Sequence, residues 1–190
     1  MMLVERLIKI MRTYDCLNRD LELVRQLELP NWWITAGYVR NYVWDDLHGY
    51  SSRTPLNDVD ILYYDPSDLS EESEKKFETI LKAKLQEYNW SCKNQARMHI
   101  RNQDHPYGSV EDAMKRWPET ATSVGLSLDR NQNIEIIAPH GLNDLFDLVI
   151  RRSPYYKDED YFYKRVQSKR WLEIWPKLRL IEEEGDFIED

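Results

Sequence analysis

A short β-strand pattern with two acidic residues sets narrow limits on the fold of this 190-residue chain. In the run from Asp58 to Ile61, alternate residues share one face of the strand. Val59 and Ile61 are apolar and face a core, so Asp58 and Asp60 point together to the opposite side. Two neighbouring carboxylates repel each other unless a cation lies between them. Mg²⁺ (or Mn²⁺) fits, because it takes one or two carboxylates together with substrate phosphates. The alternative is a strand end whose acidic residues are simply solvated.

A glycine turn precedes this pattern. The apolar run Trp32–Ala36 predicts a buried strand, Gly37 permits a tight turn, and a helix follows. The free amides and the dipole at the start of a helix make a seat for phosphate. Arg40 adds a charged contact, and we predict nucleotide or phosphate binding by Ala36, Gly37, Arg40 and Asn41. The alternative is a structural turn in which Arg40 forms a salt bridge.

A third acidic residue lies in a predicted hairpin further along the chain. Glu135 lies between Ile134 and Ile136 and faces away from the core, on a strand that we expect beside the Asp58 strand. Three carboxylates on neighbouring strands can hold two metal ions roughly 4 Å apart, which clamp the attacking and leaving oxygens in phosphoryl transfer. We therefore predict Asp58, Asp60 and Glu135 as the catalytic residues, one aspartate taking the proton of an attacking hydroxyl. The alternative is that Glu135 is an ordinary exposed residue.

The remaining patterns interleave strands and helices and predict an α/β (α+β) fold with a small mixed β-sheet flanked by helices. The length fits a single domain, residues 1–190, with a core of about 30–152. N-terminal helices (1–29) and a C-terminal helix with an acidic tail (153–190) pack on this core. The predicted elements are strands at Val59–Tyr64, Trp90–Cys92, Ser123–Leu128, Ile134–Ala138 and Leu145–Ile150, and helices at Val39–Leu47, Ser70–Tyr88, Ser109–Trp117 and Tyr161–Trp175.

Composition and charge exclude several classes of function. The net charge is −8 and the pI about 5.1, whereas general binders of nucleic acids or anionic membranes are usually basic. We therefore expect no broad nucleic-acid binding. Cys16 and Cys92 match no metal-ligand spacing and suit a reducing cytosol. No apolar run approaches membrane-spanning length, so we expect a cytoplasmic protein without membrane contact.

Two further segments are open to a functional interpretation. The polar segment Lys93–Tyr107 shows no period, and we predict that Arg97 and His99 contact phosphate, ribose or the acceptor. A surface loop whose side chains cap backbone groups is the alternative. The helix Tyr161–Trp175 carries basic residues beside aromatic ones. We interpret it first as an amphipathic helix with solvated charges, and binding of RNA or a nucleotide base is the alternative.

The order of these motifs resembles a known family. An Ala-Gly-Tyr-Val-Arg-Asn helix start followed by an Asn-Asp-Val-Asp-Ile strand resembles the head domain of CCA-adding enzymes and bacterial poly(A) polymerases, in the polymerase-beta-like nucleotidyltransferase superfamily. Their pattern is Gly-Gly-x-Val-Arg-Asp and then Asp-x-Asp. Their hairpin carries Glu-Val-Thr-Thr, with Glu135 at the glutamate. This resemblance covers about Trp32 to Ile137. Over nearly its whole length the chain resembles small bacterial nucleotidyltransferase-like proteins of unassigned function, in the segments Lys93–His99, Trp117–Thr120 and Ala138–Leu142.

The sequence departs from the head-domain pattern at several positions. Ala36 replaces the first glycine, Asn41 replaces an aspartate, and an Arg-Arg-Asp-Phe-Thr segment is missing after the hairpin. We expect no neck, body or tail domain of the kind that holds tRNA in those enzymes. The resemblance therefore implies the fold and metal binding more strongly than a tRNA substrate.

Two functions follow as expectations. The first is a Mg²⁺-dependent nucleotidyltransferase that moves a nucleoside monophosphate from a nucleoside triphosphate to a hydroxyl of an acceptor. RNA, a protein and a small molecule remain open as acceptors. The second is a nucleotide-binding or regulatory module on the same fold with weak turnover or none. A structural interaction domain is a third hypothesis, and it predicts no metal-dependent nucleotide binding.

Overall fold

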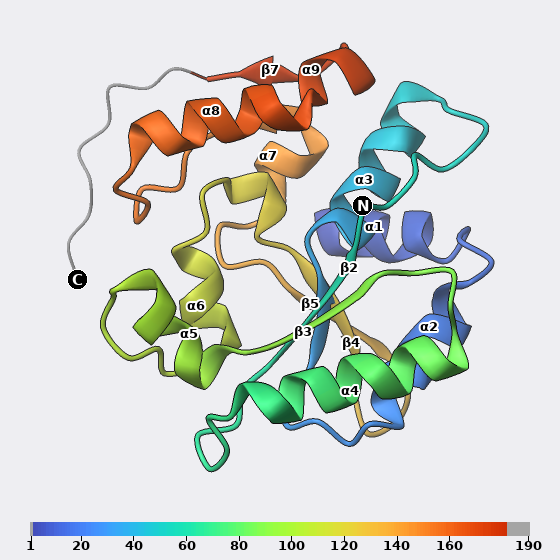
Figure 1. The fold of residues 1–190 in the computed structure, drawn as a ribbon. Coiled ribbons are helices and arrows are strands. Elements are labelled where there is room, and N and C mark those ends of the chain that lie inside the picture. The colour runs from blue at the N-terminus through green and yellow to red at the C-terminus, as the bar shows by residue number, and fades with distance from the viewer. Residues whose placement is uncertain (1, 182–190) are drawn as a thin grey trace.

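A five-stranded mixed β-sheet forms the centre of the molecule (Figure 1). In space the strands follow the order β3-β2-β1-β4-β5, with β2 and β3 parallel and the other neighbours antiparallel. The computed structural model describes residues 2–181. The predicted α/β (α+β) class with a small mixed sheet is confirmed. The strands are β1 (Trp33–Thr35), β2 (Val59–Tyr63), β3 (Trp90–Asn94), β4 (Gly125–Leu128) and β5 (Ile134–Ile137).

Helices cover the sheet unequally. Val59 and Ile61 of β2 are fully buried in the larger core, which includes side chains of α1 (Leu3–Met11), α2 (Leu17–Arg25), α3 (Gly37–His48) and α4 (Glu71–Lys84). Leu62 points to the other face and packs with Met114 of α6 (Val110–Lys115) in a smaller cluster. Because strand residues alternate, Asp60 shares this second, less covered face.

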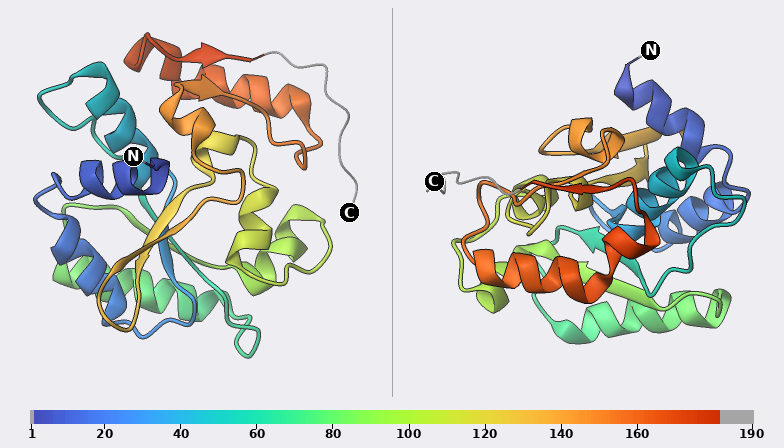
Figure 2. Two further views of the ribbon diagram at one scale, coloured as in Figure 1. Left: turned by 180° about the vertical axis from the view of Figure 1, so that it is seen from behind. Right: turned by 90° about the horizontal axis from the view of Figure 1, so that it is seen from above.

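The C-terminal elements pack on α3 rather than on the strands. They are α7 (Asn143–Phe146), β6 (Val149–Ile150), α8 (Glu159–Lys169), α9 (Trp171–Ile174) and β7 (Arg179–Leu180). The ring centroid of Trp44 in α3 lies 5.8 Å from that of Trp171 and 5.1 Å from that of Trp175. Figure 1 shows α8, α9 and β7 across the top of the molecule and α4 along the bottom. Seen from behind, the β4–β5 hairpin crosses the middle, with α1 and α2 on one side and α6 on the other (Figure 2).

Several elements differ from those expected. The polar segment forms a helix, α5 (Gln95–Asn102), which begins where the side chain of Asn94 accepts a hydrogen bond from the amide of Ala96 at 3.1 Å. Of the predicted strand Leu145–Ile150, only Val149–Ile150 is a strand (β6), because Leu145 and Phe146 belong to the short helix α7. The last helix is divided at Arg170, whose φ of 52° is left-handed. The acidic tail Glu182–Asp190 lies outside the described residues.

None of the helices within residues 2–181 combines the length and the apolar character needed to cross a lipid bilayer.

Candidate active site

Asp58 and Asp60 lie at the start of β2. Asp58 comes directly before the strand and is exposed, whereas Asp60 is half-buried within it. Asp60 is opposite Thr35 of β1 and Ser91 of β3, and it forms a side-chain hydrogen bond with Ser91. Both aspartates line the same cavity. The sheet thus fixes the backbone of Asp60 from both sides.

The surroundings of Asp60 disfavour the ionised form of its carboxyl group. Burial, followed by the negative charge of Asp58, raises the pKa of Asp60 to about 6. The hydrogen bond with Ser91 and the positive charges of Arg40 and Arg165 oppose this rise. Within residues 2–181 neither aspartate forms an ion pair. The carboxyl groups of Asp58 and Asp60 therefore repel each other in this fold, and a bound cation would relieve that repulsion.

The turn between β1 and α3 is strained at Ala36. This residue has φ 55° and ψ −124°, a conformation that favours glycine. Its carbonyl accepts hydrogen bonds from the amides of Val39 (3.1 Å) and Arg40 (2.9 Å). Because helix α3 begins at Gly37, the amides of Gly37 and Tyr38 have no carbonyl partner within the helix. The positive φ gives a physical reason for the glycine that the head-domain pattern has here.

Arg40 is buried, with only 6% of its surface exposed. Its guanidinium donates to the Thr122 hydroxyl at 2.7 Å and to Asn41 Oδ1 at 2.8 and 3.2 Å. It also lies 4.3 Å from the ring centroid of Trp171 and 5.2 Å from that of Trp44. Burial lowers the pKa of Arg40 to about 10, so the group remains charged at neutral pH. Arg40 thus pairs with the neutral side chains of Thr122 and Asn41, and not with an acidic residue as the structural alternative required.

Two cavities meet at the aspartates. A side cavity of about 210 Å³ is bounded by the start of α3, the loop before β2 and the elements α8 and α9. A main cavity of about 690 Å³ extends from Asp60 to α5, to the segment that follows α6 and to α8 with the segment before it. The residues shared by both walls are Ala36, Asp60 and Arg165.

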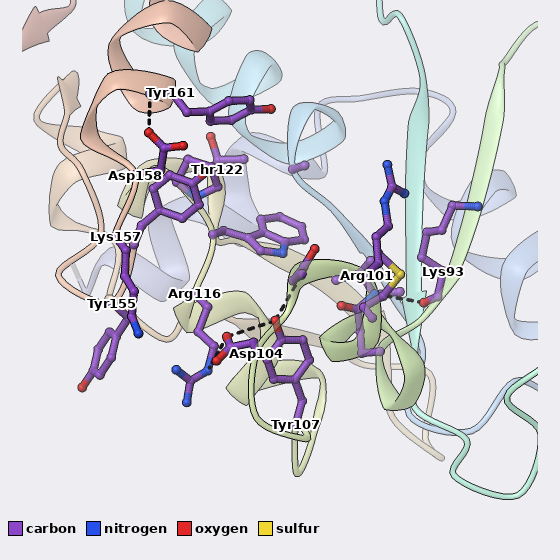
Figure 3. A pocket seen from close by; sticks show the side chains of 18 of the residues that line it. Lys93, Arg101, Asp104, Tyr107, Arg116, Thr122, Tyr155, Lys157, Asp158 and Tyr161 are labelled. Atoms are coloured by element: carbon purple, nitrogen blue, oxygen red, sulfur yellow. Dashed lines mark hydrogen bonds and ion pairs between the residues drawn. The ribbon is translucent and has the colours of Figure 1, made fainter. Parts of the chain in front are cut away.

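The main cavity has a mixed aromatic and charged lining (Figure 3). Tyr155, Lys157 and Tyr161 lie on one side of it, and Lys93 and Arg101 lie on the other. The volume is in the range of small-molecule binding sites, about 300–1,000 Å³.

The structure brings most of the predicted site together. The side cavity is lined by Ala36, Gly37, Arg40, Asn41, Asp58 and Asp60, among others. The two segments that the sequence suggested for phosphate and for metal therefore face one space.

The expected position of Glu135 is wrong. Strand β5 forms the edge of the sheet, three places from β2, and three strand spacings of about 4.8 Å separate the two by about 14 Å. Glu135 is exposed and lines a different hollow with Trp33 and Asp129. Among the described residues, no three His, Cys, Asp or Glu side chains are grouped to hold a metal. The reason is non-local pairing, because β1 and β4 lie between β2 and β5.

Arg97 forms ion pairs instead of lining a cavity. Its guanidinium binds Glu74 at 2.8 and 3.0 Å and Glu71 at 3.1 Å. Glu74 is buried and also accepts a hydrogen bond of 2.8 Å from the amide of Asn94. Arg97 therefore joins α5 to α4, and its predicted contact with substrate has no support in this position.

His99 also lies away from the cavity walls. Its ring packs edge-on against Tyr107, with 6.1 Å between the ring centroids. Helix α5 presents Gln95, Met98 and Arg101 to the main cavity instead. Because residues three or four apart in a helix share a face, Arg97 and His99 do not lie on the face of α5 that lines this cavity.

Helix α8 lines both cavities, although no site residue was predicted on it. Arg165 lines both cavities and Lys169 lines the side cavity, whereas Lys164 and Arg170 are exposed. The basic and aromatic residues of Tyr161–Trp175 did indicate such a role, but the first interpretation was an amphipathic helix with solvated charges.

Residues 22–180 match the family described as nucleotidyltransferase. Because this match covers most of the chain, the protein belongs to that family. A comparison with curated proteins finds no match.

Solved structures agree with this assignment. An NMR structure said to reveal a CCA-adding enzyme head domain is 30% identical, with a TM-score of 0.80 over 94% of this chain and 96% of that one. A CCA-adding enzyme in complex with CTP is 13% identical, with a TM-score of 0.56 over 93% of this chain and 43% of that one. The Thermotoga maritima CCA-adding enzyme complexed with tRNA is 15% identical, with a TM-score of 0.54 over 87% and 38%. The last two likenesses show the fold alone. The suspected relation to the head domain is confirmed.

Proposed function

We propose that this protein transfers a nucleoside monophosphate from a nucleoside triphosphate to an acceptor hydroxyl, with Mg²⁺ (or Mn²⁺) bound by Asp58 and Asp60. One observation carries the proposal. The two aspartates, the start of α3 and the guanidinium of Arg40 line a single cavity, and that cavity adjoins a second, larger one at Asp60.

The chemistry of the donor set supports a divalent metal. Asp58 and Asp60 offer hard oxygen ligands, and burial together with the charge of Asp58 raises the pKa of Asp60, a cost that a bound cation would offset. Two carboxylates completed by substrate phosphates are a usual ligand set for Mg²⁺. When bound, the metal would neutralise charge on the phosphates.

The side cavity suits the triphosphate. Arg40, Arg165 and Lys169 line it together with the first turn of α3, so positive groups surround the place next to the aspartates. In the reaction the acceptor oxygen bonds to the α-phosphorus. The bond from that phosphorus to the bridging oxygen breaks, and pyrophosphate leaves. The hydroxyl proton passes to a carboxylate oxygen of one of the two aspartates.

The main cavity then remains for the nucleoside and the acceptor. Trp117, Tyr155 and Tyr161 offer aromatic surfaces for a base or another ring. RNA, a protein and a small molecule stay open as acceptors.

A nucleotide-binding module without turnover is the second candidate. The strain at Ala36 favours it, because a methyl group stands in the turn where phosphate and backbone approach each other.

Nucleotide transfer tests the proposal. The protein is incubated with each of four nucleoside triphosphates labelled at the α-phosphate, with Mg²⁺ and a panel of RNA, protein and small-molecule acceptors. Label transfer with pyrophosphate release, lost in Asp58→Asn and Asp60→Asn but kept in Glu135→Gln, supports the enzyme. Binding without either product supports the module, and no binding contradicts both.

A further inference from the structure

Arg165 occupies the boundary between the two cavities. It is one of the residues that line both, together with Asp60 and Ala36. Its positive charge acts on Asp60, whose pKa it lowers. A cation in this position lies beside the space that a phosphate would occupy if a metal ion joined it to the aspartates.

Glu119 forms an ion pair with a single nitrogen of the Arg165 guanidinium. Arg165 Nε donates to Glu119 Oε1 at 2.7 Å, and the carboxylate is 1% exposed. The second oxygen, Oε2, has no hydrogen-bond partner among the described atoms. A two-pronged pair would engage both oxygens. Glu119 therefore pairs with Nε alone and leaves the terminal nitrogens of the guanidinium for a ligand, and Tyr161 is a further side-chain partner of Arg165.

The surroundings keep the guanidinium in place. Its central carbon lies 5.8 Å from the ring centroid of Trp171, the same ring that Arg40 contacts. Glu119 acts on both arginines, because its charge partly offsets the effect of burial on Arg40. Arg165 and Arg40 thus share one tryptophan and one carboxylate.

We propose that Arg165 is a catalytic residue that binds the reacting phosphate of the nucleoside triphosphate, and that Glu119 is its positioning residue. This inference rests on the proposed function. Arg165 donates through its terminal nitrogens to the phosphate oxygens as charge shifts toward the leaving pyrophosphate. Glu119 fixes the direction of the side chain through Nε.

The test compares ligands that differ only in their phosphates. Arg165→Gln combined with Glu119→Gln keeps a hydrogen-bonded neutral pair, so that no buried charge is left alone. Lys164→Ala and Arg170→Ala remove exposed charges from or next to the same helix and serve as controls. Calorimetry with Mg²⁺ measures the affinity of each variant for a nucleoside triphosphate and for the matching nucleoside, and thermal unfolding checks that each variant is folded.

The double variant is expected to lose about 10- to 100-fold in triphosphate affinity, the value of a hydrogen bond to a charged group. Its affinity for the nucleoside stays within twofold, and the controls match wild type. Glu119→Gln alone, which keeps an acceptor for Nε, weakens the triphosphate less. An equal loss for triphosphate and nucleoside overturns the inference, because it indicates a structural role. If wild type and the double variant bind the triphosphate equally well, the inference about Arg165 is overturned and the proposed function is not. If wild type binds no triphosphate, the proposed function is overturned as well.

Discussion

Thr35 and Asp60 lie directly opposite each other in neighbouring antiparallel strands, and the Thr35 hydroxyl donates a hydrogen bond of 3.2 Å to the main-chain carbonyl of Asp60. Ala36, the residue of the phosphate turn, follows Thr35 in the chain. The register of one strand pair therefore sets the turn against the aspartates. Two motifs that are separate in sequence form one site because of main-chain pairing.

Asp60→Asn is expected to stabilise the metal-free protein. The pKa of Asp60 rises from its ordinary 3.8 to about 6 in the fold, through burial and then Asp58. Below about pH 4 Asp60 is protonated in both the folded and the unfolded state, so its ionisation does not lower the free energy of unfolding. Between about pH 4 and 6 only the unfolded state ionises, and stability falls. Above about pH 6 the penalty is complete, up to about 3 kcal/mol at 1.36 kcal/mol per pKa unit.

Urea unfolding of both proteins at pH 4 and pH 7.5 measures this effect. The asparagine variant should exceed wild type at pH 7.5 and approach it at pH 4. Added Mg²⁺ should raise the stability of wild type only. An advantage that does not change with pH would show that the carboxylate of Asp60 is not under strain.

Ala36→Gly should also stabilise the fold, by about 1 kcal/mol. The backbone of Ala36 has φ 55°, a conformation that costs a residue with a Cβ about 1–3 kcal/mol and glycine little. The greater freedom of glycine in the unfolded chain offsets part of this gain. As a control, Ala83→Gly in the exposed part of α4 should cost up to about 1 kcal/mol. A loss of stability at both positions would mean that the turn is not strained.

Gly125→Ala is expected to damage the site through the sheet. A Cβ at this position would lie 2.7 Å from Thr35 Cγ2 and 3.2 Å from the carbonyl oxygen of Ile34. Relieving the overlap displaces Thr35 and should cost about 1–3 kcal/mol. Gly108→Ala is the control, because its nearest neighbour would be 3.9 Å away. Chemical unfolding compares the two, and equal stability would contradict the tight packing of β1 against β4.

Glu135→Gln should leave nucleotide binding and transfer unchanged, because the edge strand β5 holds this side chain away from both cavities. Titration of the nucleoside triphosphate with Mg²⁺ checks this. A loss comparable with that of Asp58→Asn would mean that Glu135 reaches the metal after all.

Local patterns predicted the fold well where a strand or helix has a buried face. The β2 strand and the turn at Gly37 follow from alternation and from glycine chemistry. Helix α5 was missed because its buried residues include the polar Gln95 instead of an apolar stripe, although Asn94 offered a recognisable helix cap. The break at Arg170 has no local signal, since arginine rarely takes a left-handed φ.

The site was only partly predictable for a different reason. Asp58 and Asp60 share a face by the geometry of one strand. Glu135 required the strand order, and Arg97 required its partner Glu74 on another helix, neither of which a local pattern contains. Arg165 joins the site through the packing of α8, a contact between distant parts of the chain.

The most direct test is calorimetric titration of wild type and an Asp58→Asn/Asp60→Asn double variant with each of the four nucleoside triphosphates, with and without Mg²⁺. Our account predicts that wild type binds at least one triphosphate in a Mg²⁺-dependent manner and that the double variant, still folded, does not. Binding by the double variant with unchanged affinity, or no binding by folded wild type, would contradict the assignment of the metal and nucleotide site.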